Sequence, residues 1–373
     1  MTEAVQKIKK PKKAWTPLFV ITKRDTLPLV KRVLIRAAAI VAALLLCSVI
    51  TLVVTGSNPL QIYKTMFSGA FGNSIRIVRT LYELSVLLVI AVAITPAFKM
   101  KFWNTGAEGQ VLIGGLSTAI VMLTLGGRIP DWTLIIIMAA AATAAGVIWG
   151  VLPAFFKAYW KTNETLFTLM MNYVAIQLVE CFLKIADKTG SNVVGPTTLS
   201  HGWFPQLFKT DYLLDVVIIA VITVLVYIYL RYSKHGYEIS VVGESENTAK
   251  YVGINVKKVI IRTMALSGAL CGIAGLLIVG GASHSISAET AGGRGFTAIM
   301  VSWLAKFNPL MMVFSSLLIV FLERGAGEVA TVFALNKSFS DILTGIILFF
   351  IIGCEFFINY KLHFRKHSKE ATV

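Results

Sequence analysis

Polar side chains gather in two short segments that lie among apolar residues of this sequence. The first, 102–110, has the sequence FWNTGAEGQ and contains Asn104, Glu108 and Gln110. Carboxylates and amides are costly in apolar surroundings, and in membrane proteins they often mark the pathway of a substrate or ion. We therefore expect these three side chains to line or gate a pathway. The alternative is helix capping by Asn104 and Glu108, because a negative charge in a first turn suits the helix dipole.

A second polar segment, 163–172, begins another apolar run with the sequence NETLFTLMMN. Asn163 suits the N-cap position of a helix, where its side chain can accept a backbone hydrogen bond. Asn172 falls two turns further on, where a buried amide needs a partner. We expect Glu164 and Asn172 to line or gate the same pathway as the first segment.

A single arginine, Arg294, stands between glycines in the sequence GGRGF, ahead of a short apolar run. We expect it on the outer side of the membrane, where it would dock an acidic partner protein. An ordinary arginine at the membrane interface is the alternative.

Motifs for several common enzyme chemistries are missing from the sequence. It contains neither the phosphate-binding motif GxxxxGK[ST] nor the hydrolase motifs HExxH and GxSxG. Its closely spaced histidines, His363 and His367, lie in a basic stretch near the C-terminus, which favours a solvated tail over a metal site. We therefore expect a protein that is not an enzyme and that binds no metal or cofactor itself.

The elements that position these polar residues are long apolar runs. Hydrophobic residues make up 56% of the 373 and charged residues only 14%, whereas soluble domains have about 25% charged residues. A membrane span needs roughly 20 mostly apolar residues. Clear candidates occupy 33–55, 81–98, 133–153, 165–185, 213–231, 258–281 and 339–358, and shorter ones occupy 109–125, 295–306 and 309–324. We predict an all-α, polytopic transmembrane helix bundle of about ten spans, with eight as the alternative.

The basic residues indicate the orientation of this bundle. The net charge is +16, and on the span assignment 25 of the 35 Lys and Arg residues fall on one side. That side is cytoplasmic by the positive-inside rule. We therefore expect both termini in the cytoplasm, with a basic arm at 1–32 and a basic tail at 359–373. Because the cations lie at span ends, they suit a lipid bilayer and not a nucleic acid.

The region 33–358 is predicted to form one transmembrane domain with two notable loops. The outer loop, 186–212, is rich in Gly, Pro, Ser and Thr, which is compatible equally with an ordered external cap and with a plain connector. Small residues at 139–146 and 267–275 have the spacing of closely packed helices. We expect that packing within one bundle.

The inner loop, 232–257, is expected to form a short cytoplasmic helix between two turns. Such a helix, fixed between two spans, would receive force from a soluble motor. A solvated loop without that role is the alternative. The residues expected to couple to a motor are Gly236, Gly243, Glu244, Asn247, Ala249, Gly253 and Ile254.

This loop resembles the ATPase-coupling segment of ABC importer permeases for simple sugars, nucleosides and branched-chain amino acids. The matching positions are Gly236, Gly243, Ala249, Gly253 and Ile254. The sequence departs from that pattern at Ser240, Ser245 and Thr248, where Arg, Asn and Ala are usual in the family.

Three further segments are similar to the same family. NTGAEGQVLIGG at 104–115 and NETLFTLMMNY at 163–173 resemble signatures of its nucleoside-type branch. GFTAIMVSWLAKFNPL at 295–310 resembles a third family segment, with Ala305 and Lys306 in place of the usual Gly-Arg. The resemblance covers about 33–358.

The resemblance implies a type II ABC importer permease, specifically the larger permease of a nucleoside system. Its partners would be a second permease subunit, cytoplasmic ABC ATPases that hold ATP and Mg, and an extracytoplasmic substrate-binding lipoprotein. A simple-sugar or amino-acid permease of the same family remains an alternative. So does an ion-coupled secondary transporter, which would need no ATPase.

Overall fold

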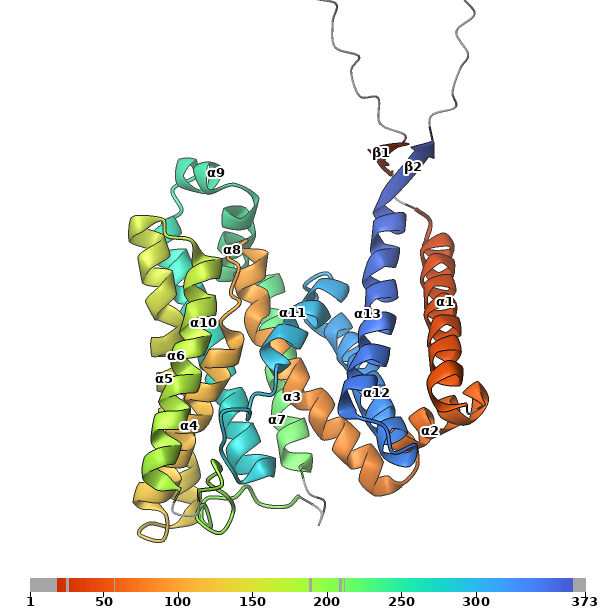
Figure 1. Ribbon diagram of the computed structural model, residues 1–373. Coiled ribbons are helices and arrows are strands. Elements are labelled where there is room, and N and C mark those ends of the chain that lie inside the picture. Colours follow the sequence, from red (N-terminus) through yellow and green to blue (C-terminus); the bar gives the residue numbers. More distant parts are fainter. Residues whose placement is uncertain are drawn as a thin grey trace, which may run out of the picture. The chain divides into compact units, whose positions relative to one another are not determined.

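The computed structural model describes residues 19–24, 27–56, 58–187, 190–207, 210 and 212–364. Most of the basic arm and residues 365–373 of the basic tail lie outside this part of the chain. Helices make up most of the described residues (Figure 1). The predicted all-α bundle is confirmed.

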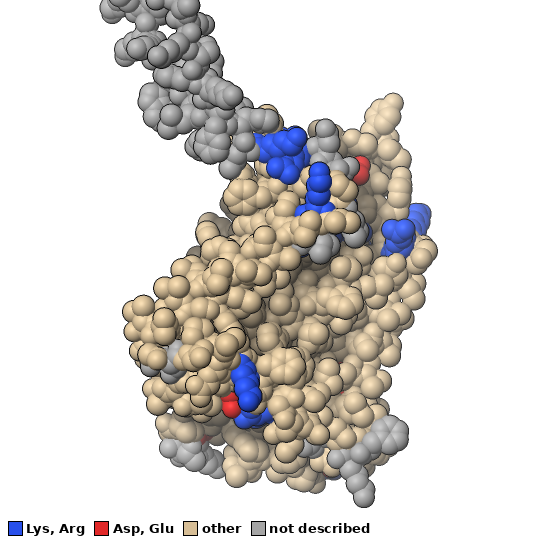
Figure 2. Space-filling model, turned by 90° about the vertical axis from the view of Figure 1, so that its right-hand side faces the viewer, with Lys and Arg blue, Asp and Glu red and all other residues tan. Residues whose placement is uncertain are grey.

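Nine helices in the described part of the chain are long and apolar enough to cross a membrane. They are α1 (Leu29–Thr55), α3 (Ser74–Lys99), α4 (Ala107–Leu125), α5 (Asp131–Trp160), α6 (Glu164–Ala186), α7 (Leu213–Tyr232), α10 (Val256–Leu276), α12 (Pro309–Val332) and α13 (Lys337–Asn359). The face shown in Figure 2 consists mainly of residues other than Lys, Arg, Asp and Glu, as expected for a surface in contact with lipid.

Two short helices differ from the expected spans. The run at 295–306 forms α11 (Arg294–Leu304), whose 11 residues reach only about 16 Å at 1.5 Å per residue, half of a hydrocarbon core of about 30 Å. It is therefore not a complete span. α2 (Pro59–Phe71) was not predicted, because its 13 residues are too few to give a span signal.

The chain divides into two compact units, 1–62 with 336–373, and 63–335. In the first unit α1 packs against α13, and an ion pair joins Arg36 to Glu355. β1 (Phe19–Lys23) pairs antiparallel with β2 (Tyr360–Phe364). The segments before α1 and after α13 therefore lie at the same end of this unit.

The second unit is built around α10, which packs against α3, α4 and α5. A Cβ atom added to Gly146 of α5 or Gly268 of α10 would collide with the backbone of the facing helix. The predicted close packing of small residues within one bundle is therefore confirmed. α10 continues into a π-helix, η1 (Leu277–Ser283).

The inner loop forms two helices, α8 (Lys234–Glu244) and α9 (Glu246–Tyr251), and not the single helix that was expected. The break lies at Ser245, whose extended backbone (φ −160°) ends α8 and whose hydroxyl accepts a hydrogen bond from the Thr248 amide at 3.2 Å. A Ser N-cap of this kind starts a new helix, which is why one segment became two.

Candidate translocation site

The segment 102–110 forms a joint at the start of α4. The Asn104 side chain is fully buried, and its Oδ1 accepts hydrogen bonds from the Gly106 amide (3.1 Å) and from Gln110 Nε2 (3.3 Å). Its Nδ2 donates to Ser267 Oγ of α10 at 3.2 Å. The two amides thus satisfy one another and attach α4 to α10.

Glu108 joins α4 to a helix far along the chain. Its two carboxylate oxygens accept hydrogen bonds from the backbone amides of Gly293 and Gly295, both at 2.7 Å. These amides lie at the start of α11, where the helix dipole favours a negative charge. Glu108 therefore caps α11. The sequence analysis considered only capping of the helix that contains Glu108, which is α4.

Asn172 has the partner that its burial required. Its Oδ1 accepts from the Gly109 amide at 2.8 Å, and its Nδ2 donates to the Thr105 carbonyl at 2.9 Å. It thereby attaches α6 to the start of α4. We call the joint formed by Asn104, Thr105, Glu108, Gln110, Asn172 and Ser267 the α4 hub.

Glu164 lies outside the α4 hub. It forms an ion pair of 2.7 Å with Lys157 Nζ, which joins the adjoining ends of α5 and α6. Asn163 caps α6 by accepting a hydrogen bond from the Leu166 amide at 3.2 Å. Of the predicted pathway residues, the structure thus brings together Asn104, Glu108, Gln110 and Asn172.

The α4 hub lies well inside the helix bundle. Ser267 is eleven residues from the start of α10, and Asn172 is eight residues from the start of α6. At 1.5 Å per residue these positions are roughly 12–16 Å along their helices. α4 and α11 therefore both begin part-way along the neighbouring helices α6 and α10, as discontinuous helices do at transport sites.

A cavity of about 260 Å³ reaches the start of α11. Its lining is dominated by hydroxyl and charged groups: Arg79, Tyr82, Glu83, Tyr212, Ile278, Ser283, Ser285, Ser287, Thr290 and Arg294. We call it the hydroxyl cavity. Arg294 is half-buried on its wall, and its predicted role in docking a partner protein stays a prediction.

The sequence analysis did not single out most residues of this cavity. Arg76, Arg79 and Glu83 recur at spacings of three and four residues, which places them on one side of α3. That spacing could have indicated a polar site. Charged residues near the end of an apolar run are also typical of an ordinary solvated helix end, so the spacing alone did not identify the cavity.

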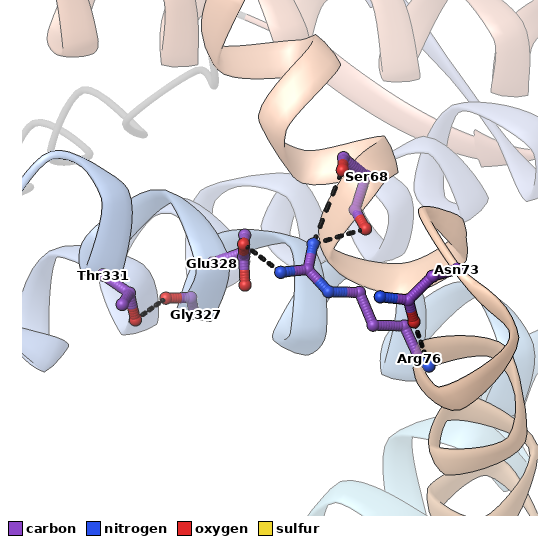
Figure 3. A network of polar contacts seen from close by, with 6 residues as sticks. All are labelled: Ser68, Asn73, Arg76, Gly327, Glu328 and Thr331. Carbon is purple, nitrogen blue, oxygen red and sulfur yellow. Dashed lines mark hydrogen bonds and ion pairs between the residues drawn. The ribbon is translucent and has the colours of Figure 1, made fainter.

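A second cavity of about 500 Å³ shares Arg79 and Glu83 with the hydroxyl cavity. Beside it, Arg76 donates to the Ser68 carbonyl at 2.8 Å and to Glu328 at 2.6 Å (Figure 3). Arg324 pairs with Glu83 at 2.9 Å. These contacts join the end of α2, the start of α3 and the end of α12. Among the described residues, no ion pair holds Arg79.

The coupling residues predicted from the sequence divide into packed and exposed groups. Gly236, Gly243 and Ala249 are buried, whereas Glu244, Asn247 and Gly253 are exposed. The Ile254 amide donates to the Ala249 carbonyl at 2.9 Å, which closes the turn after α9.

Two contacts fix α8 to the bundle. Gly243 lies directly against the Lys99 carbonyl at the end of α3, where a Cβ atom would collide. Glu238 pairs with Arg262 of α10 at 2.7 Å, and this guanidinium lowers the pKa of the Glu238 carboxyl. α8 is therefore attached to two helices, α3 and α10, that lead to the hydroxyl cavity.

Comparison with known proteins agrees with this architecture. The family model for the branched-chain amino acid transport system permease component matches residues 76–352. The nucleoside ABC transporter permease protein NupB of Lactococcus lactis is 28% identical, with 92% of this chain and 97% of that protein covered. The guanosine ABC transporter permease protein NupP of Bacillus subtilis is 27% identical, with 80% and 87% covered.

A relative that is named for a different substrate has a similar sequence identity to this chain. The glucose ABC transporter permease protein TsgB13 of Haloferax volcanii is 24% identical, with 84% of this chain and 85% of that protein covered. The family match and the nine apolar helices of the described residues identify a multi-pass membrane protein and not an enzyme. The chain belongs to the family of branched-chain amino acid transport system permease components.

Proposed function

We propose that this chain is the membrane-spanning permease subunit of an ABC importer and that it forms the translocation path for nucleosides. Two relatives that match over most of their length are named nucleoside and guanosine permeases. The hydroxyl groups and mixed charges of the hydroxyl cavity suit a substrate with several hydroxyls and no net charge.

One observation carries the proposal: the residues of the hydroxyl cavity and the contact with α8 lie at opposite ends of α3. Figure 1 shows α8 beside the end of α3. α3 has Arg79 and Glu83 in its first half and ends at Lys99 against Gly243 of α8. α10 begins just after α9 and continues into η1, whose Ser283 lines the cavity. A displacement of α8 would therefore move the cavity walls, which is what alternating access requires.

The α4 hub would transmit this displacement sideways. Asn104 attaches α4 to α10, and Glu108 attaches α4 to the start of α11, beside Arg294. We propose that Asn104, Glu108, Gln110 and Asn172 gate the path by moving as one joint. Glu164 would act separately, at the ends of α5 and α6.

The partners follow from the same arrangement. A cytoplasmic ABC ATPase, which would hold ATP and Mg, docks on α8 and α9 through exposed residues such as Glu244 and Asn247. A second permease subunit completes the membrane part, and a substrate-binding lipoprotein delivers the nucleoside from outside. The position of Arg294 on the cavity wall favours contact with the substrate as it arrives.

We propose a location in the cell membrane with both termini cytoplasmic. The pairing of β1 with β2 supports the same side for both termini. The excess of Lys and Arg supports the cytoplasm as that side.

Reconstitution tests the proposal. The permease, its partner permease, the ATPase and the binding lipoprotein are placed in vesicles, and uptake of labelled nucleosides, ribose and glucose is measured with and without ATP. We expect ATP-dependent uptake of nucleosides in preference to both sugars. Uptake that follows an ion gradient without the ATPase would support the secondary transporter instead, and preferred uptake of glucose would support a sugar permease.

A further inference from the structure

Asp215 is a buried carboxylate without a partner. It lies in the first turn of α7 with 1% of its surface exposed. Neither carboxylate oxygen has a hydrogen-bond partner among the described residues. A buried carboxylate is strongly destabilising when nothing donates to it. The position therefore calls for a donor that the described protein residues do not supply.

The carboxylate lies against the π-helix η1. Asp215 Oδ2 contacts Gly281, where a Cβ atom would collide with it. Single π-helical turns are rare and occur frequently at functional sites. A side chain at position 281 would therefore displace the carboxylate, and glycine leaves room for it beside η1.

Asp215 and Gly281 both line a cavity of about 250 Å³ whose other walls are largely aromatic. Its ring-bearing residues are Trp203, Phe204, Tyr212 and His284. The rings of Trp203 and His284 are stacked, with centroids 4.1 Å apart and planes 9° from parallel. The Phe204 amide donates to the Gly280 carbonyl at 3.2 Å and so holds the outer loop over η1. We call this space the aromatic cavity.

Tyr212 lines both the aromatic cavity and the hydroxyl cavity. A flat aromatic group with N–H donors suits the first cavity, and a group with several hydroxyls suits the second. A nucleoside joins these two groups by one bond.

Resting on the proposed function, we propose that the aromatic cavity binds the base of the nucleoside and that the Asp215 carboxylate accepts hydrogen bonds from N–H groups of that base. A carboxylate offers two acceptors and no donor. The base that suits it best presents two neighbouring donors, as guanine does with N1–H and its 2-amino group. Hypoxanthine lacks the amino group, so inosine is a weaker ligand.

The test is the selectivity of the reconstituted transporter for guanosine over inosine. Asp215→Asn replaces one acceptor by a donor, so the side chain can no longer accept from both N1–H and the 2-amino group of guanine. The amide can still pair with N1–H and O6, which guanine and hypoxanthine share, so the preference for guanosine is lost. We expect the ratio of kcat/KM for guanosine to that for inosine to fall by about tenfold or more, because an unmatched buried polar group strongly disfavours a ligand. Asp341→Asn, an exposed aspartate in the first part of α13, is the matched control and leaves the ratio unchanged.

A second measurement uses the unaltered protein. In the permease–ATPase complex without the binding lipoprotein, guanosine should raise the Tm more than 1-methylguanosine, which has lost the N1–H donor, at equal concentration. An unchanged guanosine to inosine ratio in Asp215→Asn, or equal Tm shifts for the two ligands, overturns the assignment of Asp215 while nucleoside uptake stands. Absence of nucleoside uptake by the unaltered complex overturns the proposed function and this inference together.

Discussion

The α4 hub differs from the region that holds the hydroxyl and aromatic cavities, which we call the cavity end of the second unit. Both contain polar side chains, but the two regions differ in how these side chains are hydrogen-bonded. In the α4 hub, the side chains of Asn104, Glu108 and Asn172 are buried and hydrogen-bonded within the protein. At the cavity end, Asp215 is buried without a donor, and Arg79 is exposed without an ion pair among the described residues. Asp215 thus lacks the internal donors that the buried groups of the α4 hub have, whereas Glu83 beside the hydroxyl cavity pairs with Arg324.

This difference separates joints from binding sites. A satisfied group stabilises one arrangement of helices, and it becomes costly only when its partner leaves. An unsatisfied group keeps its hydrogen-bonding capacity for a ligand. We therefore expect substitutions in the α4 hub to affect assembly first, and substitutions at the cavity end to affect transport first.

The largest effect is expected for Glu108→Ala. This substitution leaves the amides of Gly293 and Gly295 without acceptors at the start of α11 and removes a charge-assisted contact between α4 and α11. We expect a loss of about 2–5 kcal/mol in the free energy of unfolding, measured as a fall in Tm and in the yield of folded protein. Glu108→Gln keeps one acceptor and should lose less. Normal Tm and yield for Glu108→Ala would remove the distinction between joint and binding site.

Gly243→Ala is expected to change the stability less than Glu108→Ala does. It should strongly weaken the coupling of ATP hydrolysis to uptake. The added Cβ would collide with the Lys99 carbonyl, so α8 must shift away from α3. We expect ATP-driven uptake to fall by about tenfold, because a misplacement of about 1 Å can have effects of that size or larger. Gly345→Ala in α13, where a Cβ meets no atom within 4 Å, is the control. Unaltered uptake and ATPase co-purification would contradict a coupling role for this contact.

The cavity end is addressed by Arg79→Gln. Arg79 lines both the hydroxyl cavity and the larger cavity beside it and forms no ion pair in the described chain. We expect KM for nucleoside uptake to rise by about tenfold, equivalent to about 1.4 kcal/mol of binding, with Tm unchanged. Arg76→Gln breaks the pair with Glu328 and should instead lower Tm. A fall in Tm without a change in KM for Arg79→Gln would place Arg79 among the structural residues.

The sequence alone predicted features that are signalled by residue types close together in one helix. The small residues of α5 and α10 predicted their packing, and the burial of Asn172 predicted the need for a partner. The helix capped by Glu108 was not predictable, because Glu108 and Gly293 are 185 residues apart. Asp215 was overlooked because an acidic residue is ordinary in a first turn, and only the fold shows that this one is buried.

The smallest effect is expected at the pair of Glu238 and Arg262, which attaches α8 to α10. Arg262 lowers the pKa of Glu238, so the pair contributes fully above the usual carboxyl pKa, and the contribution is lost as the pH falls through the lower folded-state value. A double-mutant cycle with Glu238→Gln and Arg262→Gln should give no more than about 1 kcal/mol at neutral pH, because both side chains are partly exposed and screened by salt. A coupling energy that stays constant well below pH 4 would contradict the charge interaction. A weak pair agrees with the proposed coupling, in which α8 stays attached to α10 and still shifts against it, while Gly243 supplies the closer contact with α3.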